Sequence, residues 1–192
     1  MNKLRSVPFV SIIVCTYNGA QKISKSLVSL FNQNYPKNKY EVIVVDDGST
    51  DDTLAVVSKF PIVLVKHEKN KGLAAARNTG LKKSHGELVI CFDDDCTADK
   101  HWLSELVKAY KDNSVMGAGG LITLPDKPTL TDEYCFSCGY GSPVPVTLGN
   151  SKSIFIRFFD YLVTNFSHPQ SKYTNATIVY ELPGILSSFR KN

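Results

Sequence analysis

The sequence has no long hydrophobic run. No stretch approaches the roughly 18 to 20 consecutive apolar residues that a membrane-spanning helix needs. The longest early run, residues 7–15, contains Pro8 and Ser11. It is followed by Thr16, Tyr17 and Asn18 rather than by the small residues of a signal-peptide cleavage site. We therefore expect a globular protein in the cytoplasm.

A concentrated charge of one sign is also missing over most of the chain. The formal net charge is +4, and acidic and basic residues are mixed. This pattern lacks the dense basic stripe of nucleic-acid-binding proteins, so no nucleic-acid partner is expected. Residues 151–192 differ, with five basic and two acidic side chains. This local excess is compatible with peripheral contact to an anionic membrane surface or with an acidic partner.

Cysteines are few and odd in number. Five cysteines in a chain without an export signal indicate mostly reduced thiols. Cys135 and Cys138 have the spacing of a metal-binding pair, but no second pair of Cys or His stands at matching spacing. A structural zinc site usually needs four ligands, so free thiols or one local disulfide are favoured over zinc.

Short apolar, β-branched runs alternate with amphipathic segments along the first part of the chain. The predicted strands are residues 10–15, 41–45, 61–65, 88–92 and 115–124. The predicted helices lie around residues 23–31, 54–57, 73–83 and 99–110. This alternation, with strands apolar on both faces, predicts an α/β fold with a mostly parallel sheet flanked by helices on both faces.

The texture of the sequence changes after Leu124. Repeated prolines and glycines predict a long irregular segment in place of packed elements. An aromatic-rich stretch at residues 154–163 follows and favours a helix. Such a stripe belongs to a protein core more often than to a membrane-contacting surface, and both interpretations stay open. We therefore place a boundary between residues 1–124 and an irregular loop and helical segment at residues 125–192.

Three consecutive carboxylates follow the predicted strand at residues 88–92. Asp93, Asp94 and Asp95, the aspartate triplet, repel one another unless a cation or hydrogen-bond donors compensate. Oxygen ligands suit Mg²⁺ or Mn²⁺, and Mg²⁺ commonly keeps waters and substrate phosphates in its shell. In extended backbone Asp93 and Asp95 point to one side and Asp94 to the other. The alternative is a solvated loop that caps a helix.

Two further polar clusters follow strands of the same predicted sheet. Asp46 and Asp47 end one strand, and Thr16, Tyr17 and Asn18 end another. Ligands of parallel α/β sheets bind beyond the carboxyl ends of the strands, so the three clusters should converge on one site. A carboxylate there can accept a hydrogen bond from a base N–H or a ribose hydroxyl. A capped turn is the alternative for the Asp46–Asp47 pair.

Four segments in this order resemble the signatures of family 2 glycosyltransferases with the GT-A fold. They are residues 11–18 (SIIVCTYN), 44–53 (VVDDGSTDDT), 70–80 (NKGLAAARNTG) and 92–95 (FDDD). Each is weak alone, and the four together cover the chain from about residue 10 to residue 103. The resemblance implies a Rossmann-like GT-A fold in which residues 1–124 bind a nucleotide sugar. Residues 125–192 then begin the acceptor-binding part of the same domain.

The resemblance also implies roles for individual residues. Asp47 would bind the nucleobase, usually uracil, and Asp46 would hold the turn. Asp95 would coordinate Mg²⁺ or Mn²⁺, with Asp93 assisting at the metal and Asp94 at the nucleotide. The other implied nucleotide-binding residues are Cys15, Thr16, Tyr17, Asn18, Lys71, Arg77 and Asn78. Arg77 has an equally good interpretation as a helix-surface ion pair.

The implied reaction transfers a sugar from a nucleotide-diphospho-sugar, usually a UDP-sugar, to a hydroxyl of a glycan or lipid-linked acceptor, with inversion. Such a reaction needs a carboxylate base. The acidic candidates after the aspartate triplet are Asp99, Asp112, Asp126, Asp132, Glu133, Asp160 and Glu181. None has the acidic context of the family base, although residues 181–190 resemble the segment that precedes it. We therefore expect the base beyond Asn192 in a longer enzyme.

Three other functions compete with this interpretation. A nucleotidyltransferase should carry a glycine- and arginine-rich loop after the first strand, whereas residues 16–21 contain one glycine and no arginine. A phosphoacceptor receiver domain also gathers aspartates at strand ends, but it is too small to include the segment after Leu124. The remaining alternative is a non-catalytic module that binds a sugar nucleotide and lacks the base.

Overall fold

The computed structural model describes residues 7–111, 115, 117–119 and 187–191. The chain divides into two units, of which one comprises Met1–Gly120 and Leu182–Asn192 and the other Leu121–Glu181. All described residues belong to the first unit. The boundary predicted after Leu124 lies outside them, as do the Cys135–Cys138 pair and the aromatic-rich stretch at residues 154–163.

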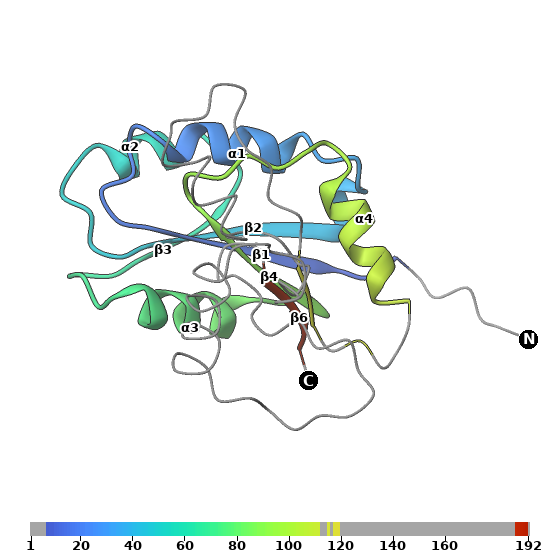
Figure 1. The fold of residues 1–192 in the computed structure, drawn as a ribbon. Helices are drawn as coiled ribbons and strands as arrows, with labels where there is room; N and C mark the ends of the chain where they lie inside the picture. The colour runs from blue at the N-terminus through green and yellow to red at the C-terminus, as the bar shows by residue number, and fades with distance from the viewer. Residues whose placement is uncertain (1–6, 112–114, 116, 120–186, 192) are drawn as a thin grey trace, which may run out of the picture. The chain divides into compact units, whose positions relative to one another are not determined.

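The described part of the chain forms one six-stranded sheet (Figure 1). In sequence order the strands are β1 (Val10–Thr16), β2 (Tyr40–Asp46), β3 (Val63–Lys66), β4 (Leu88–Asp93), β5 (Gly117–Gly119) and β6 (Ser187–Arg190). Their order across the sheet is β3-β2-β1-β4-β6-β5. The strands β1 to β4 pair in parallel, whereas β6 is antiparallel to both β4 and β5.

Helices cover both faces of the sheet, as the sequence predicts. They are α1 (Ile23–Phe31), α2 (Thr53–Val57), α3 (Leu73–Lys83) and α4 (Trp102–Ala109), with a 3-10 turn η1 (Lys37–Lys39) before β2. Figure 1 shows α1, α2 and α4 on one face and α3 on the other. Of the described helices, none is both long enough and apolar enough to cross a bilayer.

Alternate residues of the central strand supply the two cores. Ile12 of β1 packs with Leu27 of α1 and Leu103 of α4, and the neighbouring Ile13 faces Ala76 of α3. Each of these side chains is fully buried or nearly so. Burying an aliphatic side chain of this size contributes about 1.5–3 kcal/mol, so the central strands are fixed firmly enough to position the loops at their ends.

The last strand was not predicted. Residues 187–190 alternate poorly between apolar and polar, yet β6 lies between β4 and β5. Ser188 is fully buried there, and its Oγ lies 2.7 Å from Tyr110 Oη and donates to the Ala118 carbonyl at 2.7 Å. Paired hydroxyls therefore replace the apolar contacts that sequence patterns detect.

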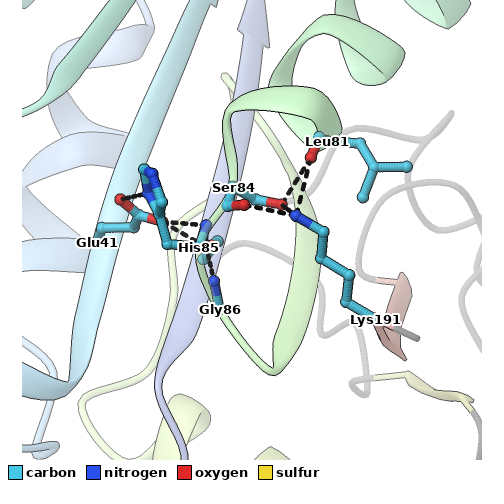
Figure 2. A network of polar contacts seen from close by, with 7 residues as sticks. Glu41, Leu81, Ser84, His85, Gly86 and Lys191 are labelled. Carbon is cyan, nitrogen blue, oxygen red and sulfur yellow. Dashed lines mark hydrogen bonds and ion pairs between the residues drawn. The ribbon is translucent and has the colours of Figure 1, made fainter.

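A hydrogen-bonded network ties the amino-terminal ends of the parallel strands together (Figure 2). Ser11 Oγ of β1 donates to Glu41 Oε1 of β2 at 2.6 Å and accepts from Gly86 N at 2.8 Å. His85 N donates to the same Glu41 oxygen at 2.8 Å. The loop before β4 is thereby fixed to β1 and β2, at the opposite end of the sheet from the aspartates.

Lys191 extends this network to α3 (Figure 2). Its Nζ donates to the Ser84 carbonyl at 2.5 Å and approaches the Leu81 carbonyl at 3.4 Å. These carbonyls lie at the C-terminal end of α3, where the helix dipole favours a positive charge. The residue that follows β6 therefore caps a helix far away in the sequence.

Candidate functional site

The carboxyl ends of β1, β2 and β4 meet at one edge of the sheet. Thr16 is the last residue of β1 and pairs with Asp46 of β2, and Cys15 pairs with Asp93 of β4. Asp47 N donates to the Thr16 carbonyl at 2.9 Å, which continues the pairing one residue beyond β2. The three polar clusters therefore converge, because parallel strands end at the same side.

Asp94 is the most buried member of the aspartate triplet. Its Oδ2 accepts a hydrogen bond of 2.6 Å from Thr16 Oγ1, and its Oδ1 lies 2.9 Å from Lys22 Nζ. The strand ends at Asp93 and residues 94–95 form a turn, so the extended alternation assumed in the sequence analysis stops there. A Cβ on Gly19 would stand 2.2 Å from Thr16 Oγ1, so this position requires glycine.

Asp93 and Asp95 are more accessible than Asp94. The Asp95 side chain is 60% exposed, and that of Asp93 is 30% exposed, with Oδ1 3.4 Å from Arg77 Nη2. Burial raises the pKa of Asp93, the Arg77 guanidinium lowers it, and the nearby Asp95 raises it again, which leaves the pKa above its ordinary value. Asp95 is therefore the carboxylate most open to a ligand, and Asp93 is held beside it.

Lys22 brings a positive charge to the aspartate triplet. Its Nζ also lies 3.9 Å from Asp95 Oδ2, and the hydrogen bond with Asp94 raises the pKa of the ammonium. Lys22 was not predicted as a site residue because it stands just before α1, outside the four segments that resemble the family. The signal that could have revealed it is a lysine placed a few residues after the first strand end, where a helix begins beside the acidic cluster.

Asp47 is nearly buried and accepts three hydrogen bonds. Its Oδ1 accepts from His67 Nδ1 at 2.6 Å and from Lys71 N at 3.0 Å, and its Oδ2 accepts from Gly72 N at 2.8 Å. Burial raises the pKa of Asp47, but the hydrogen bonds from His67 and the two amides outweigh it and leave the pKa below its ordinary value. Asp47 is thus an ionised acceptor.

Asp46 faces the other way and holds the turn after β2. Its Oδ1 accepts from Ser49 N at 3.2 Å, and the fully buried Oδ2 has no hydrogen-bond partner among the described residues. Gly48 follows with φ +80°, and a Cβ there would stand 2.6 Å from the Lys69 carbonyl carbon. Glycine at this position therefore lets the turn approach the segment before α3.

The loop after β1 lies against the loop after β2. Asn18 has a positive φ of 50°, its N donates to Ser49 Oγ at 2.9 Å, and its Oδ1 accepts from Thr50 N at 2.9 Å. Tyr17 is 47% exposed beside it, and Cys15 is half-buried. The left-handed backbone at Asn18, which asparagine tolerates well, turns the chain away from the strand and leaves the Tyr17 ring accessible.

The three predicted site residues on α3 and just before it differ in what their side chains contact. Lys71 contacts Asp47 through its backbone N, and its side chain is exposed. Arg77 forms an ion pair with Asp93, and this pair lies in the site itself, so the two predicted roles of Arg77 are met by one contact. Asn78 is exposed on the same helix. Of these three, the structure brings the side chain of Arg77 to the aspartate triplet.

The donor set suits a divalent cation that completes its shell with other ligands. Among the described residues, no three His, Cys, Asp or Glu side chains are placed to hold a metal ion by themselves. Mg²⁺ commonly uses only one or two carboxylates with waters and phosphates, and the carboxylates of Asp95 and Asp93 offer such oxygens. The described cysteines, Cys15, Cys91 and Cys96, are free thiols, as predicted.

Comparisons with known proteins identify the family of this chain. The model of the family described as glycosyl transferase family 2 matches residues 11–145. Glycosyltransferase AglE of Haloferax volcanii is 36% identical over 136 residues, which cover 67% of this chain and 45% of AglE. The uncharacterized glycosyltransferase YfnE of Bacillus subtilis is 33% identical over 115 residues, 58% of this chain and 29% of YfnE. This chain thus spans less than half the length of these relatives.

Two solved structures share the fold. The mannosyltransferase PcManGT from Pyrobaculum calidifontis, in complex with GDP-Man and Mn²⁺, matches with a TM-score of 0.59 and 33% identity, covering 62% of this chain and 36% of that one. TarS 1–349 of S. aureus with UDP-GlcNAc matches with a TM-score of 0.58 and 32% identity, covering 64% and 36%. The GT-A fold expected from the sequence is confirmed, and the chain belongs to glycosyl transferase family 2.

Proposed function

We propose that this chain binds the donor of a glycosyltransferase reaction, a nucleotide-diphospho-sugar, together with Mg²⁺ or Mn²⁺. The observation that carries the proposal is the position of Thr16. Its carbonyl accepts from Asp47 N, and its hydroxyl bonds to Asp94, so one residue fixes both acidic clusters at the same sheet edge. A nucleotide sugar would contact both clusters, with its base at Asp47 and its diphosphate at the aspartate triplet.

Asp47 is suited to the base. A carboxylate has about four lone-pair sites, and the three donors on Asp47 leave one of them on Oδ2. A base with a ring N–H, such as uracil, would fill that site. The TarS structures contain UDP or UDP-GlcNAc, which favours uracil as the base. The PcManGT structure contains GDP-Man, and its base, guanine, also carries a ring N–H. Tyr17, exposed in the loop after β1, offers a stacking surface for the base.

Asp95 and Asp93 are suited to the metal. A bound divalent cation neutralises the negative charge that develops on the diphosphate as the sugar departs. Asp95 projects into solvent, and Arg77 holds Asp93 in place next to it. Thr16 and Lys22 hold Asp94 in the turn after β4. In this proposal Asp94 assists at the ribose of the donor and does not bind the metal.

The acceptor hydroxyl would attack from the face opposite the leaving diphosphate, with inversion, and a carboxylate base would remove its proton. Of the acidic candidates named from the sequence, only Asp99 lies in the described part of the chain. Its Oδ1 accepts from His101 N at 2.8 Å, in the turn before α4. That contact gives Asp99 a role in the turn. It supports a base in the part of the enzyme that binds the glycan or lipid-linked acceptor, outside the described residues.

Calorimetric titration of UDP into the chain, with and without Mn²⁺, tests the proposal. We expect binding that strengthens at least about tenfold with Mn²⁺ and loses that dependence in Asp95→Ala, because one charge-assisted ligand is worth this much. Asp99→Ala is the matched control, since it removes an exposed carboxylate from the same loop region. Metal-dependent affinity that survives in Asp95→Ala contradicts the metal assignment, and a chain that binds no UDP contradicts the proposed donor.

Turnover separates the enzyme from a module that only binds. Release of UDP from UDP-GlcNAc in the presence of Mn²⁺, with and without added glycan acceptors, reports transfer and hydrolysis. Tight binding without any turnover supports the binding-only alternative for this chain, whereas acceptor-stimulated release supports the transferase.

A further inference from the structure

His67 is a buried side chain that the family signatures and the proposed function leave unused. It follows β3 directly, is 5% exposed, and its N donates to the Asp46 carbonyl at 2.8 Å. Its ring lies between two polar groups, with Nδ1 2.6 Å from Asp47 Oδ1 and Nε2 3.0 Å from Thr79 Oγ1. The ring therefore connects the end of β2 with the middle of α3.

The chemistry of the two partners fixes the proton on the ring. Asp47 is ionised and only accepts, so Nδ1 must carry a hydrogen. In the neutral ring Nε2 is then an acceptor, and the Thr79 hydroxyl, which is free to rotate, donates to it. Asp47 thus selects the tautomer, and Thr79 satisfies the other ring nitrogen, so each polar atom of the buried ring has a partner.

The same contacts fix the direction of the Asp47 carboxylate. Lys71 N and Gly72 N hold it from the segment before α3, and His67 holds it from the end of β3. With donors on three sides the carboxylate cannot rotate, and its remaining acceptor site on Oδ2 points in one direction. A rotated carboxylate would lose at least one of these bonds.

We propose that His67 is a positioning residue that orients Asp47 to accept a hydrogen bond from the ring N–H of the nucleobase, with Thr79 anchoring the other side of the imidazole ring. This inference rests on the proposed function. It assigns to the His67–Thr79 pair part of the selectivity for bases that carry a ring N–H. A site built around an aimed acceptor rejects a ligand that lacks the matching donor, because its own buried polar group is left unpaired.

Asparagine and glutamine at position 67 form a matched pair of variants. The amide nitrogen of asparagine reaches the place of His Nδ1, and that of glutamine reaches the place of Nε2. His67→Asn therefore keeps a donor for Asp47, whereas His67→Gln keeps the contact with Thr79 and loses the one with Asp47. Thr79→Ser and Thr79→Val form a second pair that leaves His67 in place.

The readout is the ratio of affinities for UDP and for UDP methylated at N3, whose ring N–H is replaced. We expect wild type, His67→Asn and Thr79→Ser to prefer UDP by about tenfold or more. His67→Gln should bring the ratio near one, and Thr79→Val should lower it partly. A role in folding alone would weaken both ligands equally and leave the ratio unchanged.

The outcomes separate the two proposals. A wild-type chain that binds neither ligand overturns the proposed donor and this inference with it. A wild-type chain that binds UDP and its methylated analogue equally overturns the contact of Asp47 with the base. A full preference for UDP in both His67→Gln and Thr79→Val overturns the positioning role and leaves the donor site intact. If His67→Gln is unfolded by circular dichroism, the Thr79 pair decides alone.

Discussion

Lys22 Nζ lies 2.9 Å from Asp94 Oδ1 and 3.9 Å from Asp95 Oδ2, so an ammonium stands beside two of the three carboxylates of the aspartate triplet. The Lys22 side chain is 46% exposed, and its charge is therefore partly screened by solvent. Even so, it reduces the negative potential that a divalent cation meets on approach.

Lys22→Met should therefore strengthen the binding of Mn²⁺ alone by about threefold at low salt, since a single screened charge at this distance has an effect of that size. Titration followed by the electron paramagnetic resonance signal of free Mn²⁺ measures it without nucleotide. Lys22→Arg keeps the charge and should match wild type. Unchanged or weaker binding of Mn²⁺ in Lys22→Met would show that the ammonium does not compete with the cation.

Thr16→Val should destabilise the fold through Asp94. The variant keeps the shape of the side chain but removes the donor of the 2.6 Å hydrogen bond, which leaves a buried carboxylate oxygen unpaired. Such a loss costs about 1–3 kcal/mol in the free energy of unfolding, measured by urea denaturation. Thr16→Ser retains the hydroxyl and should lose clearly less. Equal losses in the two variants would assign the effect to packing.

The network at the amino-terminal ends of the strands should matter for stability and leave ligand binding unchanged. Lys191→Met removes the donor to the carbonyls at the end of α3 and should cost about 1 kcal/mol. Lys82→Met, on the exposed surface of α3, is the control and should be neutral. UDP affinity should not change in either variant, and a weaker affinity in Lys191→Met would show that the two ends of the sheet are coupled.

Glu41 should make the fold sensitive to acid. Burial raises its pKa, but the hydrogen bonds from Ser11 and His85 outweigh it, and the pKa in the folded protein lies below the ordinary 4.5. The unfolded chain then binds more protons, so the stabilisation is complete above the ordinary pKa and disappears as the pH falls through the folded one. Glu41→Gln should be less stable than wild type by about 1–2 kcal/mol at pH 7.

The difference between Glu41→Gln and wild type should shrink as the pH falls below 4.5, and urea denaturation at a series of pH values measures it. Glu105→Gln is the control, because its carboxylate is exposed on α4 and pairs with the exposed Lys108, so the variant should lose clearly less stability than Glu41→Gln at pH 7. A constant difference between pH 7 and pH 3 would show that the effect does not depend on the charge of the Glu41 carboxylate.

The sequence predicted the parallel sheet well because buried parallel strands are continuous apolar runs bounded by polar residues. The strand predicted at residues 88–92 corresponds to β4 within one residue, and the helix predicted at residues 73–83 coincides with α3. Strand ends carry the site in this fold, so placing the strands also placed Thr16, Asp47 and the aspartate triplet at one edge.

The rest depends on contacts that no local pattern records. His67 meets Asp47 and Thr79, which are 20 and 12 residues away in the sequence, and a single histidine after a strand gives no periodic signal. Ser188 is buried in the sheet through hydrogen bonds with the Tyr110 hydroxyl and the Ala118 carbonyl, so its segment lacks the apolar run that predicts a strand. The extended geometry assumed for Asp94 failed because the strand ended one residue earlier.

The strand β6 is synthesised after β4 and β5 but lies between them in the sheet. Ser188 and Ala118 are 70 residues apart in the sequence, yet β6 pairs with β4 on one side and with β5 on the other. On the ribosome β1 to β4 emerge first and can pair early, whereas one edge of β4 has no partner until β6 has been made. Long-range pairing of this kind is slow, and an open strand edge invites association with other chains. The sheet is therefore complete only after residues 187–190 have been made, although most of its strands are encoded before residue 94.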